Sequence, residues 1–234
     1  MSKLTPKKFK EIYEQIRKEY RFPPTNLEFH DKNETPFYIQ NNTVYICLKE
    51  VPDEIMAKSI LRHEIGHMHF SPVSIANHKE CIKIIQKILY NASSAWINSQ
   101  QLTFDLANVE YDMIVDYNCK EMLKDPIEHR IELGLPKIKN NLINNYFLQL
   151  LLSYYCHLCQ KQYPELILVP KQVQQTAEKC LAIVKGYSFH NRKIQLITEL
   201  LENLANKHND SGRKIMIAGI IDADIIGTHS HPPL

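Results

Sequence analysis

Residues 60–70 read ILRHEIGHMHF and contain the strongest chemical pattern in the chain. If this segment is helical, His63 and His67 lie one turn apart on the same face, so both imidazoles can reach a single metal ion. Glu64 lies beside them. A Zn²⁺ ion lowers the pKa of its bound water, and a nearby carboxylate can take the proton and pass it to the leaving group. The spacing therefore indicates a hydrolytic zinc centre with His63 and His67 as ligands and Glu64 as the catalytic base.

The histidine pair also has a purely structural interpretation, because an HExxH string can arise by chance in a chain with eleven histidines. A catalytic zinc site normally has a third protein ligand. The extended HExxHxxGxxH pattern does not provide it, since Phe70 and Val73 occupy the positions of its glycine and its last histidine. The third ligand must therefore come from another part of the chain.

A second expected helix, residues 103–124, contains three acidic residues in its middle: Glu110, Asp112 and Asp116. A helical wheel places the two aspartates on one side and Glu110 nearly opposite, on a face that we expect to be solvated. The other positions are largely apolar, so this helix should be mostly buried. Because an unpaired buried carboxylate is costly, a metal ion with its histidines is a natural partner for the aspartates.

We therefore expect Asp112 to be the third metal ligand and Asp116, one turn later, to orient a zinc-bound histidine. Asn108 lies on the same side and is expected in the outer hydrogen-bonding layer of the site. Two alternatives stay open. Asp112 could be a buried aspartate satisfied by Arg62 or Asn108, and Glu110 could be the ligand instead.

HEIGH followed by an acidic helix resembles the gluzincin group of zinc metallopeptidases, particularly the minigluzincins and the catalytic domains of CaaX-prenyl-protease-type enzymes. The resemblance covers residues 26–124. In that group the third ligand is normally a glutamate followed four residues later by an aspartate, whereas this chain has Asp112 followed by Asp116. The resemblance implies that the strand before the HExxH helix, here residues 43–48, forms the rim of a cleft and pairs with extended substrate.

The segment GTHSHPPL is the second informative string. CaaX-prenyl-protease-type enzymes carry a similar histidine-proline segment, and this resemblance implies that His229 or His231 lines the cleft, with His231 hydrogen-bonding the developing oxyanion. HSHP also resembles the metal-binding HxHP motif of JAMM-type isopeptidases, but the serine and aspartate that this motif needs downstream are missing. A terminal segment that binds nothing is the remaining alternative.

The composition narrows the class of protein. The chain has 234 residues, a net charge of +2 and no basic stripe interleaved with aromatic residues, so we expect no nucleic-acid partner. The amino terminus lacks the pattern of a secretory signal, and the longest apolar runs fall short of a membrane span, which indicates a cytoplasmic protein. Most of the six scattered cysteines are expected to be reduced, and the Cys156–Cys159 pair lies in an apolar helical pattern rather than in a metal-binding repeat.

Glycine is scarce and apolar residues recur at helical spacing, so we expect a mainly α protein with a small β-hairpin or sheet: a zincin-like core in residues 1–130 and a helical subdomain in residues 131–234. The boundary is expected in the stretch 125–136. The hairpin should turn at residues 40–42. Expected helices cover residues 5–20, 53–70, 75–90, 103–124, 139–162, 171–185 and 191–208.

Together these features predict a zinc-dependent peptidase that acts on peptide or protein substrates. The alternative is a catalytically inactive zinc-binding or regulatory protein on a metallopeptidase scaffold, and the retained Glu64 argues against it. A helical protein with a fortuitous HEIGH string is the third interpretation.

Overall fold

The computed structural model describes residues 4–22, 24–31, 36–40, 42–70, 75–91, 100–142 and 146–209. This part of the chain is mainly helical with one small sheet, as the sequence predicts. Its elements are α1 (Pro6–Glu19), β1 (Asn26–Phe29), β2 (Phe37–Gln40), β3 (Thr43–Ile46), α2 (Glu54–Phe70), α3 (Ile75–Asn91), α4 (Gln100–Leu123), α5 (Ile127–Leu142), α6 (Tyr146–Cys159), α7 (Lys171–Gly186) and α8 (His190–Asn209), with short 3-10 helices at Leu48–Glu50 and Pro164–Leu168.

The sheet has three strands in the order β1-β3-β2. β2 and β3 form the predicted antiparallel hairpin, with Phe37 opposite Ile46, and Asn42 takes a positive φ of 60° in the turn. β1 pairs with β3 in parallel and was not predicted. β3 is therefore the central strand, paired on both sides. The expectation that residues 43–48 pair with substrate is wrong, because neither edge of that strand is free.

One hydrophobic core lies between α1, the sheet and α2. α1 begins at the Thr5 cap, whose side chain accepts a hydrogen bond from the Lys8 N–H at 3.3 Å, and Pro6 fits in its first turn. Its apolar stripe, which includes Phe9 and Ile16, packs on this core, and the hairpin covers the same core through Val44 and other apolar side chains. The core holds α2, the helix of the HEIGH string, in place.

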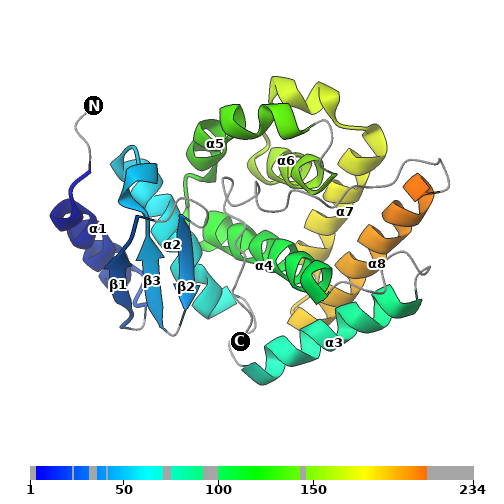
Figure 1. Ribbon diagram of the computed structural model, residues 1–234, viewed down its shortest axis with the longest axis horizontal. Helices are drawn as coiled ribbons and strands as arrows, with labels where there is room; N and C mark the ends of the chain where they lie inside the picture. Colours follow the sequence, from blue (N-terminus) through cyan, green and yellow to red (C-terminus); the bar gives the residue numbers. More distant parts are fainter. Residues whose placement is uncertain are drawn as a thin grey trace.

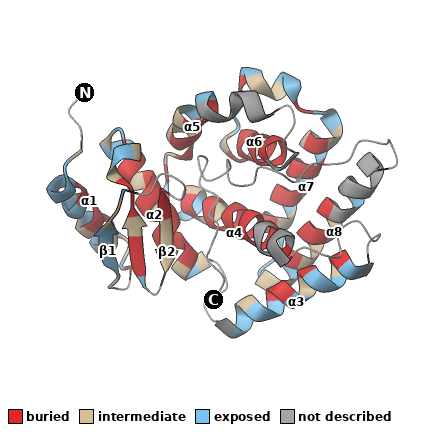
Figure 2. Ribbon diagram, in the orientation of Figure 1, coloured by how far each residue is buried: buried red, intermediate tan, exposed pale blue. Residues whose placement is uncertain are grey.

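A second core joins α3 and the helices from α4 to α8. α4 runs through the middle of the molecule, with the sheet, α1 and α2 on one side and α3, α7 and α8 on the other (Figure 1). Most of its described residues are buried (Figure 2). It contributes Val115 and Cys119 to the first core, and Val109 and Ile114 to the second. Both of its sides are therefore covered by protein.

The chain around the expected boundary is helical. α5 spans Ile127–Leu142, where we expected a connection, and the helix expected over residues 139–162 is α6, which begins only at Tyr146. Ile127, Ile131 and Leu135 recur every four residues and are buried, so they give α5 an apolar face. Pro126 lies just before its first turn, where a proline is tolerated. The division at residues 130/131 stays a prediction, and α5 runs across it.

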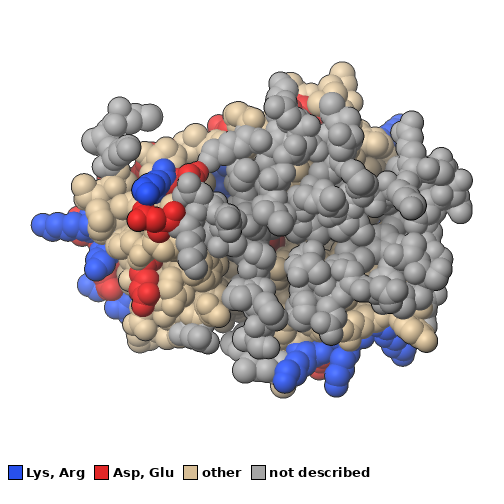
Figure 3. All heavy atoms as spheres, in the orientation of Figure 1, with Lys and Arg blue, Asp and Glu red and all other residues tan. Residues whose placement is uncertain are grey.

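The surface and the cysteines give two further observations. On the face in Figure 3, lysine and arginine side chains gather near α1 and along α3, and acidic side chains lie among those near α1 and the sheet. Among the described residues, no helix is long and apolar enough to cross a membrane. All six cysteines are free thiols, in agreement with the expectation that most are reduced.

Candidate metal centre

α2 carries His63, Glu64 and His67 into the interior of the protein. Asp53 precedes the helix, and its carboxylate accepts a hydrogen bond from the Met56 N–H at 2.8 Å, which caps the first turn. Ten residues later the three polar side chains follow, and their exposed fractions are 0% for His63, 1% for Glu64 and 6% for His67. Imidazole and carboxylate groups buried to this extent need polar partners.

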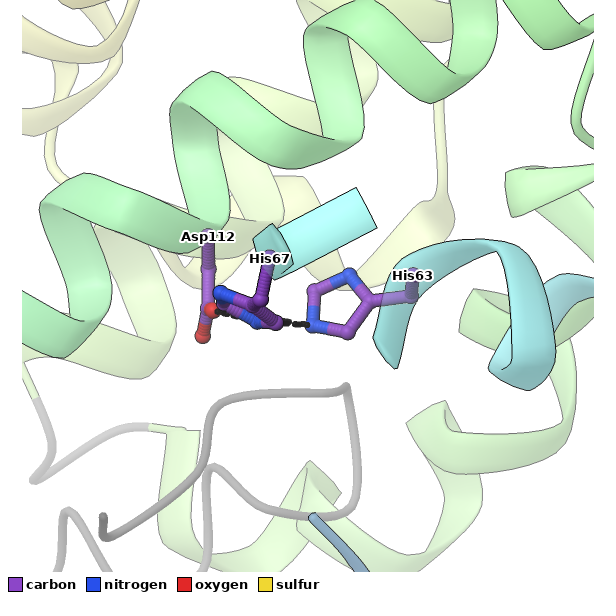
Figure 4. A group of neighbouring side chains, drawn as sticks. All are labelled: His63, His67 and Asp112. Carbon is purple, nitrogen blue, oxygen red and sulfur yellow. Dashed lines mark hydrogen bonds and ion pairs between the residues drawn. The ribbon is translucent and has the colours of Figure 1, made fainter. Parts of the chain in front are cut away.

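α4 provides the carboxylate that meets the two histidines. Asp112 Oδ1 lies 3.5 Å from His63 Nε2 and 3.1 Å from His67 Nε2, and the two Nε2 atoms lie 3.1 Å apart. The three side chains converge on one point between α2 and α4 (Figure 4). This is the only group of three or more potential metal-binding side chains found among the described residues. The structure therefore brings together the three ligands that the sequence predicts.

These distances fit the geometry of bound zinc. In a tetrahedral site with bonds of about 2.0–2.1 Å, neighbouring ligand atoms lie about 3.3–3.4 Å apart. The three separations, from 3.1 to 3.5 Å, bracket that value. Each residue offers one ligand atom, so a fourth position is left for water. The donor set, two imidazoles and one carboxylate, is one that catalytic zinc sites use.

Arg62 does not donate a hydrogen bond to Asp112, so the alternative in which Arg62 satisfies this carboxylate is wrong. Both carboxylate oxygens of Asp112 are buried, and neither has a hydrogen-bond partner of good geometry among the described residues. The Arg62 guanidinium contacts Asp125 at 3.4 Å and the Tyr20 hydroxyl at 2.9 Å instead. The polar atoms nearest to Asp112 are the two histidine nitrogens, and a cation at the point where the ligands converge would offset the cost of burying its charge.

Asp116 occupies the position predicted for it, behind His63. Its Oδ1 lies 2.7 Å from His63 Nδ1, so Nδ1 donates and Nε2 is left to face the centre. Two residues that the sequence analysis missed hold this carboxylate: Arg130 of α5 donates to Oδ1 at 2.5 Å, and Tyr155 of α6 donates to Oδ2 at 2.7 Å. The only sequence signal for Arg130 is its place within the buried apolar face of α5. Tyr155 lies in an apolar run without such a signal.

Charge in the centre is distributed unevenly. Burial disfavours protonation of His63, but Asp116 and Asp112 outweigh it and raise the pKa of His63 to about 10. Burial lowers the pKa of His67. Burial works against ionised carboxylates, yet the two histidines lower the pKa of Asp112, and Arg130 with His63 lowers the pKa of Asp116. The two aspartates therefore favour a positive charge at His63, next to the point where the potential ligand atoms converge.

Gly66 sets how closely α2 and α4 approach. A Cβ atom there would lie 2.9 Å from Val115 Cγ1 and 3.0 Å from Cys119 Sγ, both on α4. Only a residue without a side chain lets the two helices come this near, and the helix that carries the histidines thereby reaches the helix that carries Asp112. A glycine inside a helix lowers stability by about 1 kcal/mol relative to alanine. Its presence in the HEIGH string was therefore a sequence signal of close packing at this position.

Other predicted site residues have different outcomes. The prediction that Glu110 lies on a solvated face is wrong, because this residue is fully buried. It lies on the other side of α4 from the metal centre, where the Thr198 hydroxyl of α8 donates a hydrogen bond to it at 2.7 Å. Asn108 is buried one turn before Asp112, and its role in the outer layer stays a prediction. His229 and His231 lie outside the described residues.

Two further side-chain groups are structural. His69 packs against Phe22, with ring centroids 4.7 Å apart, and does not belong to the group of potential ligands. Cys156 and Cys159 belong to no potential metal-binding group among the described residues. Both cysteines pack with the second core.

Comparisons of this chain with protein-family models, with curated proteins and with solved structures gave no match. The site is therefore interpreted from its own geometry.

Proposed function

We propose that the protein is a zinc-dependent peptidase in which His63 Nε2, His67 Nε2 and the Asp112 carboxylate hold the metal. One observation carries the proposal: three buried ligand atoms from two helices lie 3.1–3.5 Å apart, with a buried glutamate next to one of the histidines in the same helical turn. A site built only to bind zinc has no need of that glutamate. Hydrolysis does, because it requires a base for water.

The residues of the chain divide the work as follows. Bound zinc supplies a Lewis acid that polarises a carbonyl and lowers the pKa of water. Glu64 takes the proton from that water and delivers it to the departing amine. Asp116, held by Arg130 and Tyr155, keeps the His63 proton on Nδ1. The burial of these groups excludes bulk water and strengthens their interactions.

The sheet supports a peptide as the substrate. β2 packs against α2 and pairs with β3, and its other edge has no strand partner among the described residues. An extended peptide can add to such an edge through main-chain hydrogen bonds. We assign peptide alignment to β2 in place of β3.

The test combines metal content with turnover. The purified protein is expected to contain one zinc per chain and to cleave a mixed peptide library, with cleavage read by mass spectrometry. Glu64→Gln should retain zinc and lose at least about 100-fold in kcat/KM, in line with the loss of a general base. Glu54→Gln is the matched control, because Glu54 starts the same helix on the surface and pairs with Lys8. It should behave as wild type.

Three outcomes would contradict the proposal in different ways. Zinc without glutamate-dependent cleavage would favour the inactive zinc-binding or regulatory protein. Absence of bound zinc, even after addition of zinc to the purified protein, would favour the structural histidine pair. Cleavage that survives Glu64→Gln would point to a contaminating peptidase or to different chemistry.

A further inference from the structure

A small pocket lies at the start of β2, next to the first half of α2. Its volume is about 250 Å³. α5 closes it on the third side. The walls are formed by Pro36, Phe37, Pro52, Met56, Leu133 and Gly134.

Most of the residues that line this β2-α2-α5 pocket are apolar. Phe37 and Met56 are each only 5% exposed and belong to the first core, and Leu133 packs against the same core. Lys49 and Glu50 complete the lining. The Lys49 ammonium is paired with Asp31 at 2.7 Å on the exposed surface, so its charge has a partner outside the pocket. The interior therefore suits an apolar group better than a charged one.

The size of the pocket indicates one side chain and not a free ligand. Pockets for small molecules usually measure about 300–1,000 Å³. This pocket, at about 250 Å³, is smaller than that range. A leucine, methionine or phenylalanine side chain is the kind of group that a space of this size and lining can bury.

The pocket is linked to the metal centre by α2. Met56 precedes His63 by seven residues, which places them two turns and about 10.5 Å apart along one face of the helix. An extended peptide rises about 3.3 Å per residue, so that span corresponds to about three residues. Phe37, which lines the pocket, is also the first residue of β2, the strand to which we assign peptide alignment. A peptide that paired with β2 and ran along α2 would place one side chain at the pocket, with the residue about three positions away at the level of His63.

We propose that the β2-α2-α5 pocket is a specificity site that receives a large apolar side chain of the peptide substrate, about three residues from the cleaved bond. This inference rests on the proposed peptidase function. Full burial of such a side chain is worth about a 10- to 100-fold preference over a charged one at the same position.

The first test uses cleavage by the zinc-loaded protein. Glycine-serine dodecapeptides that carry a single leucine, phenylalanine, aspartate or lysine at the same position serve as substrates. Wild type should cleave the leucine and phenylalanine peptides at least about tenfold faster, at a fixed distance of about three residues from the apolar side chain. Leu133→Glu should remove this preference. Ile55→Glu is the matched control, because Ile55 is 48% exposed beside Met56 and does not line the pocket.

The second test reads binding without catalysis and does not depend on any variant folding. The methionine ε-methyl groups are labelled with ¹³C, and the phenylalanine and lysine peptides are titrated into the zinc-loaded wild-type protein at low temperature. The Met56 methyl resonance should shift with the phenylalanine peptide and not with the lysine peptide. Met122, which is 64% exposed on α4, provides an internal reference that should not move.

The two tests separate failure of the pocket from failure of the peptidase function. A Met56 shift without any cleavage would show that the pocket binds an apolar side chain, but it would overturn the peptidase proposal and with it the role of the pocket in cleavage. Cleavage that ignores the apolar residue, with no Met56 shift, would overturn the pocket and retain the peptidase. Absence of both cleavage and shift would overturn both.

Discussion

The two sides of α4 each bury a carboxylate, two residues apart in sequence, and treat it in opposite ways. On the side facing α2, Asp112 lies within 3.5 Å of two histidine nitrogens and its pKa is lowered. On the side facing α8, Glu110 meets the Thr198 hydroxyl at 2.7 Å, and burial raises its pKa well above the usual value. The surroundings of Asp112 favour its ionised form, and those of Glu110 favour its neutral form.

This difference teaches that burial alone does not identify a metal ligand. Both side chains are at most 1% exposed. The two carboxylates differ in their partners. The Asp112 carboxylate and two imidazole nitrogens converge on one point, where a cation fits. Glu110 accepts a hydrogen bond from the neutral hydroxyl of Thr198, and this contact needs no cation. The four predictions below test whether only the α2 side of α4 is a metal site.

The largest effect is expected from matched carboxylate-to-amide changes on the two sides. Asp112→Asn removes an anionic ligand and should weaken zinc binding by more than the roughly 10- to 100-fold that loss of an outer partner costs. Glu110→Gln should leave zinc affinity within about threefold, because it touches no ligand. Competition with a fluorescent zinc indicator measures both. Equal losses in the two variants would erase the distinction between the two sides.

Two adjacent tyrosines sharpen the comparison further. Tyr155 donates to Asp116 at 2.7 Å, whereas Tyr154 donates to the Met113 carbonyl at 2.6 Å, and both are fully buried. Tyr155→Phe should weaken zinc binding by about tenfold through Asp116 and His63. Tyr154→Phe should lower the free energy of unfolding by about 1 kcal/mol, because it removes one buried hydrogen bond, and it should leave zinc affinity unchanged. If both variants lower zinc affinity equally, the effect is general packing and not orientation of the ligand.

The contact between α2 and α4 gives the third prediction. Gly66→Ala places a Cβ against Val115 and Cys119 and should lower the free energy of unfolding by about 1–3 kcal/mol, with weaker zinc binding. Gly186→Ala is the control, since an added Cβ there would meet no atom within 4 Å outside its chain neighbours and the backbone of its own helix. Urea unfolding measures both variants. Adding Val115→Ala to Gly66→Ala should restore part of the loss, and an unchanged Gly66→Ala would show that the helices do not need their close approach.

The α8 side predicts a dependence on pH. Because the pKa of Glu110 is raised in the folded protein, the folded state keeps a proton that the unfolded state loses above about pH 4.3. Its contribution to the free energy of unfolding is fully present at lower pH and falls as pH rises toward the raised pKa, by up to about 1.4 kcal/mol per pH unit. Relative to wild type, Glu110→Gln should therefore become more stable as pH increases from 4.5. Parallel pH profiles for the two proteins would contradict a neutral Glu110.

The sequence was sufficient for the α2 side of α4 and insufficient for the α8 side. His63, His67 and Asp112 follow from i,i+4 spacing and from the cost of buried carboxylates, and Asp116 follows one turn later. The burial of Glu110 was not predicted because a helical wheel shows the direction in which a side chain points and not which other helix packs there. α8 covers that side, and nothing in the sequence near Glu110 announces a contact with Thr198, 88 residues away.

Other parts of the structure were predictable to different degrees. The hairpin of β2 and β3 could be predicted from its turn and its β-branched residues. The parallel pairing of β1 with β3 could not, because β2 lies between these two strands in the chain and local sequence patterns do not encode such a pairing. α5 was missed because residues 125–136 were interpreted as the boundary between the two parts of the chain. Arg130 and Tyr155 were missed because they act through Asp116 and not through the motif.

The most direct test of the account is zinc-edge anomalous diffraction from crystals of the full chain grown with equimolar zinc. The account predicts one strong peak, within about 2.0–2.2 Å of His63 Nε2, His67 Nε2 and an Asp112 oxygen. A peak elsewhere, such as at His229 and His231 or at the Cys156–Cys159 pair, would contradict it. So would a map in which His63 Nε2 and an Asp112 oxygen lie at hydrogen-bond distance with no anomalous peak beside them.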